Sequence, residues 1–106
     1  MKIRILTATL TAALFIGAAP AHAATTAQAK RATSAELNDR YDHVHAIYVE
    51  GCKRLTSTYF RCSWTVRQMY ADCGMPYLLN HEGSAYVRFY GRTPDVMLRT
   101  TTSDCL

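Results

Sequence analysis

The stretch that decides the fold is Tyr59-Phe-Arg-Cys-Ser-Trp-Thr-Val-Arg67, in which apolar and polar side chains alternate without a break. Successive side chains of a β-strand point to opposite faces of a sheet, so the alternation predicts a strand with one buried face. The residues expected on the buried face are Phe60, Cys62, Trp64 and Val66. The opposite face carries arginine and tyrosine side chains, and it is either the solvated side of a sheet or a binding surface.

Further strand signals follow this stretch along the chain. Residues 84–90 alternate in the same way, and residues 96–102 are rich in β-branched side chains, so each segment is expected to form a strand. Residues 76–79 predict a short edge strand, because proline is tolerated at the first position of such a strand. Residues 80–83 are typical of a turn, and residues 91–95 are typical of a hairpin loop.

A helix is predicted before the first of these strands. Thr33 and Glu36 have the spacing of a capping box, in which each side chain bonds the backbone of the other residue. Apolar residues then recur at helical spacing at Leu37, Tyr41, Val44 and Tyr48. Gly51 is suited to the left-handed conformation that often ends a helix. The pattern therefore predicts a helix over about residues 34–50.

One helix followed by three or four strands with short connections indicates an α+β domain. The N-terminal helix would pack on one face of a three- to four-stranded antiparallel sheet, stapled by two disulfides. The covered residues would be Phe60, Trp64, Val66, Val87, Phe89, Val96 and Leu98. We expect one domain over residues 33–106, preceded by a flexible leader over residues 24–32, which are small, polar and aperiodic.

Residues 1–23 have the pattern of a cleaved signal peptide. A short basic segment precedes an uncharged apolar run, and the final Ala-His-Ala has the small side chains that a signal peptidase reads. The apolar run is too short to span a bilayer, so we expect no stable membrane insertion after cleavage. These features predict an exported bacterial protein, periplasmic or secreted. The remaining chain has ten basic and eight acidic residues, an excess too small to indicate a nucleic-acid partner.

All four cysteines, Cys52, Cys62, Cys73 and Cys105, lie after the predicted signal peptide. Small exported domains commonly add disulfides to a limited core, so two bridges are expected, with three connectivities open. Loop entropy alone does not choose among them. A turn at residues 56–58 would bring Cys52 and Cys62 opposite each other, which favours the pairs Cys52–Cys62 and Cys73–Cys105.

If a helix covers one face of the sheet, the other face stays uncovered. The residues expected there are Tyr59, Arg61, Arg67, Tyr86, Arg88, Tyr90, Met97 and Arg99. In one interpretation, cross-strand pairs merely stabilise a solvated face. In the other, the set recognises an acidic protein or an anionic envelope polymer, because its four arginines are accompanied by no acidic residue.

Three histidines are the candidates for metal binding or catalysis. On the predicted helix, His43 and His45 are two residues apart and would point away from each other. The acidic residues are scattered, and the sequence has no phosphate-binding loop or nucleophile motif. We therefore expect no catalytic residue, no metal and no cofactor. A small periplasmic hydrolase or metal-dependent enzyme using His43, His45 or His81 stays an alternative.

The sequence thus predicts a small exported binding module that acts through its arginine- and tyrosine-bearing face. An inhibitor or an immunity-type protein is the kind of role that such a module would have. A structural or envelope-stress accessory protein is a further alternative. The residues do not identify the partner or the oligomeric state.

Overall fold

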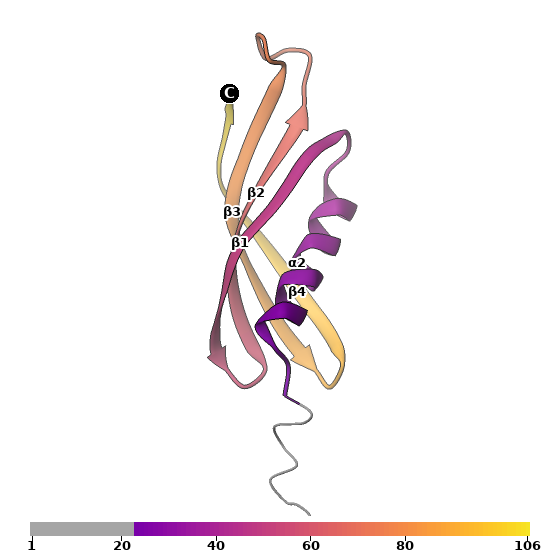
Figure 1. Ribbon diagram of the computed structural model, residues 1–106, viewed down its shortest axis with the longest axis vertical. Helices are drawn as coiled ribbons and strands as arrows, with labels where there is room; N and C mark the ends of the chain where they lie inside the picture. The colour runs from indigo at the N-terminus through magenta and orange to yellow at the C-terminus, as the bar shows by residue number, and fades with distance from the viewer. Residues whose placement is uncertain (1–22) are drawn as a thin grey trace, which may run out of the picture.

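The computed structural model describes residues 23–106, so nearly all of the predicted signal peptide lies outside the described residues. The elements are α2 (Thr26–Arg40), β1 (Val44–Thr56), β2 (Tyr59–Met69), β3 (Leu78–Tyr90) and β4 (Thr93–Cys105). The strands form one antiparallel sheet in the order β1-β2-β3-β4, with α2 lying across one face (Figure 1). The predicted α+β fold, with one helix on an antiparallel sheet, is confirmed.

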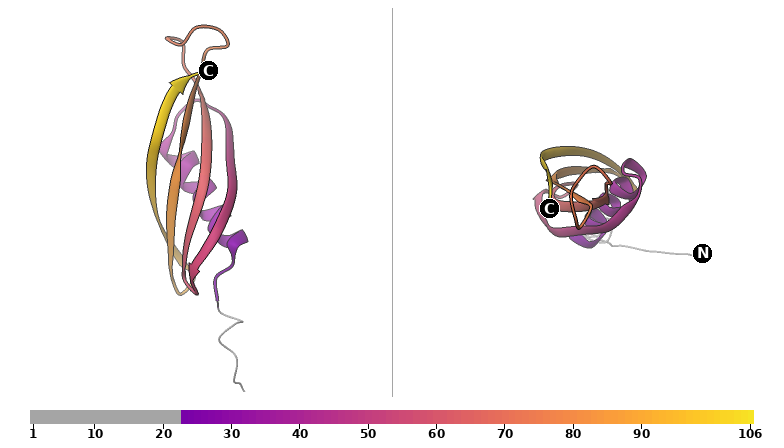
Figure 2. Two further views of the ribbon diagram at one scale, coloured as in Figure 1. Left: turned by 90° about the vertical axis from the view of Figure 1, so that its left-hand side faces the viewer. Right: turned by 90° about the horizontal axis from the view of Figure 1, so that it is seen from above.

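The sheet is twisted and curls around the helix, as the view from above in Figure 2 shows. We call the face toward α2 the concave face and the opposite one the convex face. Helix α2 packs against all four strands. The curl therefore encloses a small core between one helix and one sheet.

The core is built from the side chains that the alternation of β2 and β3 turns toward the helix. The fully or almost fully buried strand residues are Phe60, Cys62, Trp64, Val66, Ala85, Val87 and Phe89. Ala29 and Leu37 of α2 pack against them. Val96 and Leu98 are partly buried at the border of this cluster. The prediction of which strand residues the helix covers is confirmed.

Gly83 lets the largest of these side chains lie flat on the sheet. It stands opposite Trp64 in the β2–β3 ladder. A Cβ atom on Gly83 would lie 2.6 Å from Cζ2 of Trp64 and would also collide with the backbone carbonyl of Arg99. Packing therefore requires glycine here.

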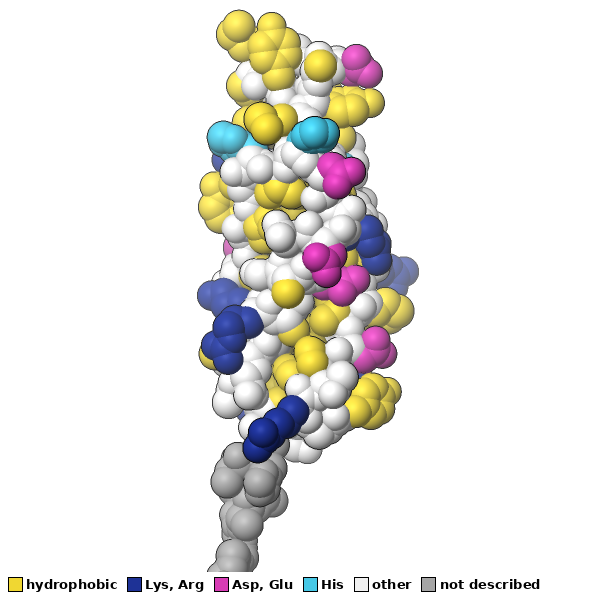
Figure 3. Space-filling view, turned by 90° about the vertical axis from the view of Figure 1, so that its right-hand side faces the viewer, with side chains coloured by type: hydrophobic (Ala, Val, Ile, Leu, Met, Phe, Trp, Pro, Cys, Tyr) yellow, Lys and Arg dark blue, Asp and Glu magenta, His cyan; other side chains and the backbone are white. Residues whose placement is uncertain are grey.

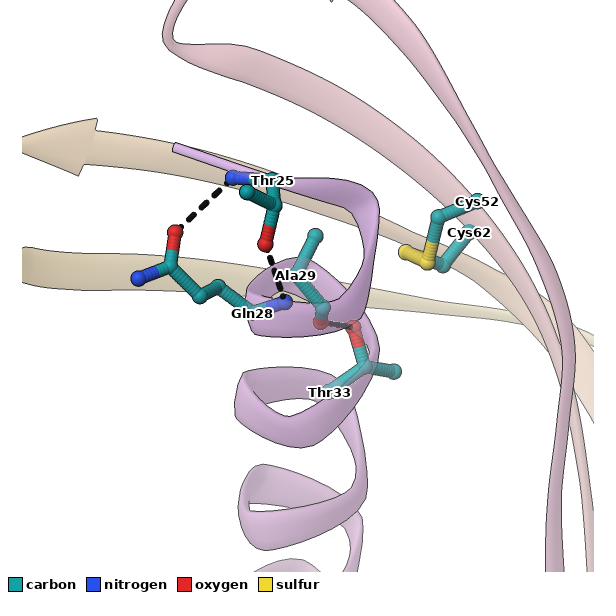
Figure 4. The surroundings of a disulfide bond; sticks show 6 residues. All are labelled: Thr25, Gln28, Ala29, Thr33, Cys52 and Cys62. Carbon is teal, nitrogen blue, oxygen red and sulfur yellow. Dashed lines mark hydrogen bonds between the residues drawn. A yellow bond between two sulfur atoms is a disulfide. The ribbon is translucent and has the colours of Figure 1, made fainter. Parts of the chain in front are cut away.

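The helix begins and ends earlier than the sequence predicts. Its N-cap is Thr25, which forms the capping box with Gln28, and its last residue is Arg40. Thr33, the predicted cap, is buried in mid-helix, where its hydroxyl donates to the Ala29 carbonyl at 2.9 Å (Figure 4). The prediction of a flexible leader over residues 24–32 is wrong, because residues 26–32 form the first half of α2.

The second half of the predicted helix is a strand. Residues 44–50 belong to β1, which pairs with β2 along its length. The register between β1 and β2 shifts between Val44 and Ala46 and again between Val49 and Gly51. These irregularities interrupt the two-residue period of the strand, so its apolar positions imitate a helical spacing. The prediction of a helix over residues 34–50 is wrong beyond residue 40.

Strands β3 and β4 are longer than predicted. Residues 80–83, predicted as a turn, lie within β3. Of the predicted edge strand at 76–79, residues 76–77 are loop and residues 78–79 are the start of β3. Of the polar side chains that suggested a turn, Asn80 and Glu82 lie on the convex side of a continuous strand, whereas His81 is buried on the concave side. Gly91, at a φ of 64°, and Arg92 form the whole β3–β4 turn, so residues 93–95 belong to β4 rather than to a loop.

Both favoured disulfides are present. Cys52 and Cys62 are direct partners in the β1–β2 ladder, with Cα atoms 4.0 Å apart. Cys73, in the loop between β2 and β3, bonds Cys105 at the end of β4, with Cα atoms 5.5 Å apart. Two disulfides indicate an oxidising environment. Within residues 23–106, no helix has the length and apolar character to cross a membrane.

Candidate functional site

The strand registers bring the predicted surface residues to the convex face. Ladder partners form rows across the sheet, and one row consists of Arg61, Tyr86 and Met97. The next row consists of Tyr59, Arg88 and Asp95. These rows lie toward the end of the sheet that carries the β1–β2 and β3–β4 turns (Figure 1).

Within these rows, aromatic and cationic groups contact one another. The Arg88 guanidinium lies over the Tyr59 ring, 4.2 Å from its centroid. The Tyr59 and Tyr86 rings stack with centroids 6.2 Å apart. We call this region the basic aromatic patch, and its members are Tyr59, Arg61, Tyr86, Arg88, Tyr90, Met97 and Arg99. Because the aromatic rings are held on neighbouring strands, the patch is preformed.

The arginines of the patch keep unpaired charges. Among residues 23–106, the ion pair within 4 Å is Arg40 with Glu36 on α2, at 3.9 Å. Arg61, Arg88 and Arg99 are exposed and have no such partner in that part of the chain. Their charges are therefore free to meet an anionic group from outside the molecule.

Arg67 is separate from the patch. It lies nearer the other end of β2, is half-buried, and places its guanidinium 5.6 Å from the centroid of Tyr48. Its Nε atom is buried without a hydrogen-bond partner in the described part of the chain. Arg67 thus contributes to packing on the convex face more than to an exposed surface.

The convex face also carries acidic residues that the sequence interpretation did not place there. Asp95 stands opposite Arg88, Glu82 stands opposite Thr102, and Asp104 stands opposite Asn80. All three lay outside the predicted strands: Glu82 in the predicted turn, Asp95 in the predicted hairpin loop and Asp104 beyond the predicted last strand. The convex face is therefore mixed in charge, with its arginines concentrated near the turns.

The opposite end of the sheet bears an open apolar groove of about 1110 Å³. Its lining residues are His43, His45, Met69, Tyr70, Ala71, Asp72, Pro76, Tyr77 and Leu78. Hydrophobic and histidine side chains gather at this end in Figure 3. Sequence reasoning missed the groove. The available signal was the cluster of large apolar residues in and around the irregular segment 68–75, which is too short to bury all of them.

The three candidate histidines do not come together. His43 and His45 line the groove, so the helix-based argument that separated them is wrong. His81 is buried on the concave face, where its ring contacts Ser103 Oγ at 2.7 Å and Gln68 Oε1 at 3.0 Å. Burial lowers the pKa of His81 below its ordinary value of 6.5. The residues described contain no group of three or more potential metal ligands.

The cysteines offer no nucleophile, because all four are joined in disulfides. The exposed guanidinium groups and aromatic rings of the convex face can form charge and aromatic contacts with a partner. Comparisons with protein-family models, with curated proteins and with solved structures found no match to this chain.

Proposed function

We propose that this protein is an exported bacterial binding module that recognises an acidic surface of another protein through its basic aromatic patch. The observation that carries the proposal is the exposure of Arg61, Arg88 and Arg99 without ion-pair partners in the described part of the chain, beside stacked tyrosines. Unpaired guanidinium groups on a preformed surface favour a partner that supplies carboxylates.

The composition of the patch supports a protein as the partner. Tyrosine, arginine and methionine are enriched at protein interfaces, and tyrosine and arginine are frequent among the residues that dominate binding energy. Met97 and Tyr90, both 63% exposed, would add apolar contact area to the charges. Strand pairing and a disulfide hold the surface in place, which lowers the entropy cost of association. An inhibitor or an immunity-type protein would use such a surface.

Export is supported by the signal-like pattern of residues 1–23 and by the two disulfides. Among residues 23–106, the first buried residue is Ala24, and this position is consistent with cleavage after Ala23. Ala24 is only 5% exposed, and its carbonyl accepts a hydrogen bond from Arg54 at 2.7 Å. Packing thus involves the residue that directly follows the predicted cleavage site.

The test compares two charge-reversed variants of the oxidised chain over residues 24–106. Arg61→Glu/Arg88→Glu alters the patch, whereas Lys30→Glu/Arg31→Glu changes the net charge equally at exposed positions of α2. Each chain is used to capture and cross-link partners from the periplasm or culture medium. The dissociation constant of the captured protein is then measured at several salt concentrations.

We expect the patch variant to bind at least about tenfold more weakly, because loss of a dominant interface residue costs about 2 kcal/mol or more. The α2 variant should bind like the wild type, and added salt should weaken wild-type binding. Equal binding by both variants would contradict the proposal. Retention of an anionic glycan in place of any protein would contradict the choice of partner.

A further inference from the structure

Strand β4 forms an edge of the sheet with a long regular segment. It pairs with β3 on one side, and Figure 2 shows it at the border of the sheet. The β3–β4 register shifts between Glu82 and Gly83, which stand opposite Thr102 and Thr100. Thr101 is therefore an extra residue, and residues 93–100 form a stretch without a bulge. An edge of this kind is able to pair with another strand.

One hydrogen bond shows which backbone groups face outward on this edge. The Phe89 amide donates to the Thr58 carbonyl at 2.8 Å, so the polar groups of Phe89 point toward β2. Pro94 stands opposite Phe89, and its backbone consequently points away from β3. The same holds for every second residue that follows, so the amide and carbonyl groups of Val96, Leu98 and Thr100 are directed outward.

Two opposite charges flank Met97 on the convex face of this edge. Asp95 and Arg99 are four residues apart on one strand, about 14 Å, so they cannot bond each other within one chain. Neither has an ion-pair partner among the residues described. Met97, midway between them, is 63% exposed. This order of charges is complementary to itself when the strand is reversed.

We propose that β4 pairs with β4 of a second copy of this chain, antiparallel and with the twofold axis at Met97. Asp95 then faces Arg99 of the second copy, and Arg99 faces Asp95 of the second copy. On the concave side, Val96 and Leu98 face their reversed counterparts, and their outward amide and carbonyl groups complete the ladder. Met97 contacts Met97 of the second copy in a closely spaced pair without hydrogen bonds.

The charges and the bulge select this register. With the axis at Met97, the paired residues of the two copies lie within residues 93–101. The ladder then ends at Thr101, the extra residue that borders the regular segment. A shift that placed the axis between Arg99 and Thr100 would set Asp95 against Asp104 and draw the bulge into the ladder. Pro94 has no amide hydrogen to donate, so the ladder weakens at each end. The contact is isologous and closes as a dimer.

The joined sheet extends the rows of the convex face. Asp95 would lie between Arg88 of its own chain and Arg99 of the second copy, and Met97 would continue the row of Arg61 and Tyr86. Arg61 and Arg88 stay on the exposed face in the dimer. Met97 and Arg99 also belong to the basic aromatic patch, so the second copy would occupy that border of the patch. The inference does not rest on the proposed function, and the two tests are distinguishable because the binding test alters Arg61 and Arg88 whereas the dimer test alters Asp95 and Arg99.

The test measures association of the oxidised chain over residues 24–106 by sedimentation velocity across a concentration series. Asp95→Arg and Arg99→Asp each create two like-charge contacts in the dimer, so each should weaken association at least about tenfold. Asp95→Arg/Arg99→Asp should restore the dimer. An equimolar mixture of the two single variants should form a heterodimer, because their reversed charges match.

Matched controls change the same charges outside the ladder. Arg92→Asp alters the β3–β4 turn, and Asp104→Arg alters β4 beyond Thr101, so neither should affect association. Near-ultraviolet circular dichroism of Trp64 checks that each variant is folded. A wild-type chain that is monomeric throughout the series would overturn the proposal. So would a dimer unaffected by Arg99→Asp, or a double variant that associates as weakly as the single ones.

Discussion

The two faces of the sheet differ sharply although their residues alternate along the same strands. On the concave face, Phe60, Trp64 and Val87 are 0–1% exposed. On the convex face, Arg61 and Arg88, one residue away from these positions, are exposed. The Cys52–Cys62 disulfide also serves the concave side, since Cys62 is buried in the core cluster and Cys52 packs against it. The difference teaches that packing on the concave face supplies most of the stability. The side chains of the convex face are therefore not constrained by the core and can vary to suit a binding role.

The largest effect is expected for truncation on the concave face. Trp64→Ala removes a side chain that is 1% exposed and should lower the free energy of unfolding by about 4 kcal/mol. Trp64→Phe is the control, and it should cost much less, because the Nε1 of Trp64 has no hydrogen-bond partner within residues 23–106. Denaturant unfolding of both variants measures the difference, and similar losses would contradict this account.

The next largest loss of unfolding free energy is expected when the disulfide that closes the longer loop is removed. Cys73 and Cys105 are 32 residues apart, whereas Cys52 and Cys62 are 10 apart. Loop entropy predicts a loss of about 3.5 kcal/mol for Cys73→Ala/Cys105→Ala and about 2.5 kcal/mol for Cys52→Ala/Cys62→Ala. Urea unfolding of the two double variants tests this order. The reverse order would show that packing around Cys62 outweighs the entropy of the open loop.

A methyl group added to a glycine of the sheet should be destabilising only where other atoms already occupy the space beside it. Gly83→Ala forces a shift of Trp64 or of the β4 backbone and should cost about 1–3 kcal/mol. Gly51→Ala, also within a strand, meets no atom within 4 Å and should be nearly neutral. Thermal unfolding of the pair checks the contrast, and a neutral Gly83→Ala would contradict the packing described.

On the convex face, stability should change little. Arg88→Ala removes the contact with Tyr59, and an exposed cation–π pair contributes about 0.5–1 kcal/mol. Its unfolding free energy should therefore fall by no more than about 1 kcal/mol. A loss of unfolding free energy as large as that of Trp64→Ala would contradict the claim that the concave face supplies most of the stability.

The smallest effect concerns the pH dependence of the concave face. Burial lowers the pKa of His81 in the folded chain, so the unfolded chain binds the proton more readily. The contribution of neutral, buried His81 to the free energy of unfolding is fully present above the ordinary pKa of 6.5. It is lost as the pH falls through 6.5 toward the lower pKa of the folded chain. His81→Gln should unfold with a weaker dependence on pH between 7.5 and 5 than the exposed control His45→Gln. Equal dependence in both variants would exclude His81 as its source.

The sequence predicts a strand best where the strand is regular. Strand β2 pairs with β3 without a register shift, so its two-residue alternation is visible from Tyr59 onward. Strand β1 contains three irregularities, which depend on how it pairs with β2 and are not encoded in its local pattern. The concave core and both disulfides followed from β2 and its turn, whereas the strand at 44–50 did not.

The helix start was ambiguous for a different reason. Thr25 with Gln28 and Thr33 with Glu36 both have the spacing of a capping box. The choice depends on tertiary packing, because Thr33 is tolerated inside the helix once its buried hydroxyl bonds the Ala29 carbonyl. The sequence predicted which arginines lie on the convex face. It did not predict the acidic residues there, because they lie in the parts of β3 and β4 that extend beyond the predicted strands. The groove could not be predicted, because it is lined by the loop between β2 and β3, and local sequence patterns do not determine the path of that loop.

The burial of Ala24 has a consequence for the export that we propose. A signal peptidase binds its substrate as extended, accessible chain, but the Ala24 carbonyl is held by Arg54 at the end of the β1–β2 hairpin. On this proposal, cleavage next to Ala24 would have to precede the docking of α2 on the sheet. A precursor that folded first would shield its own processing site.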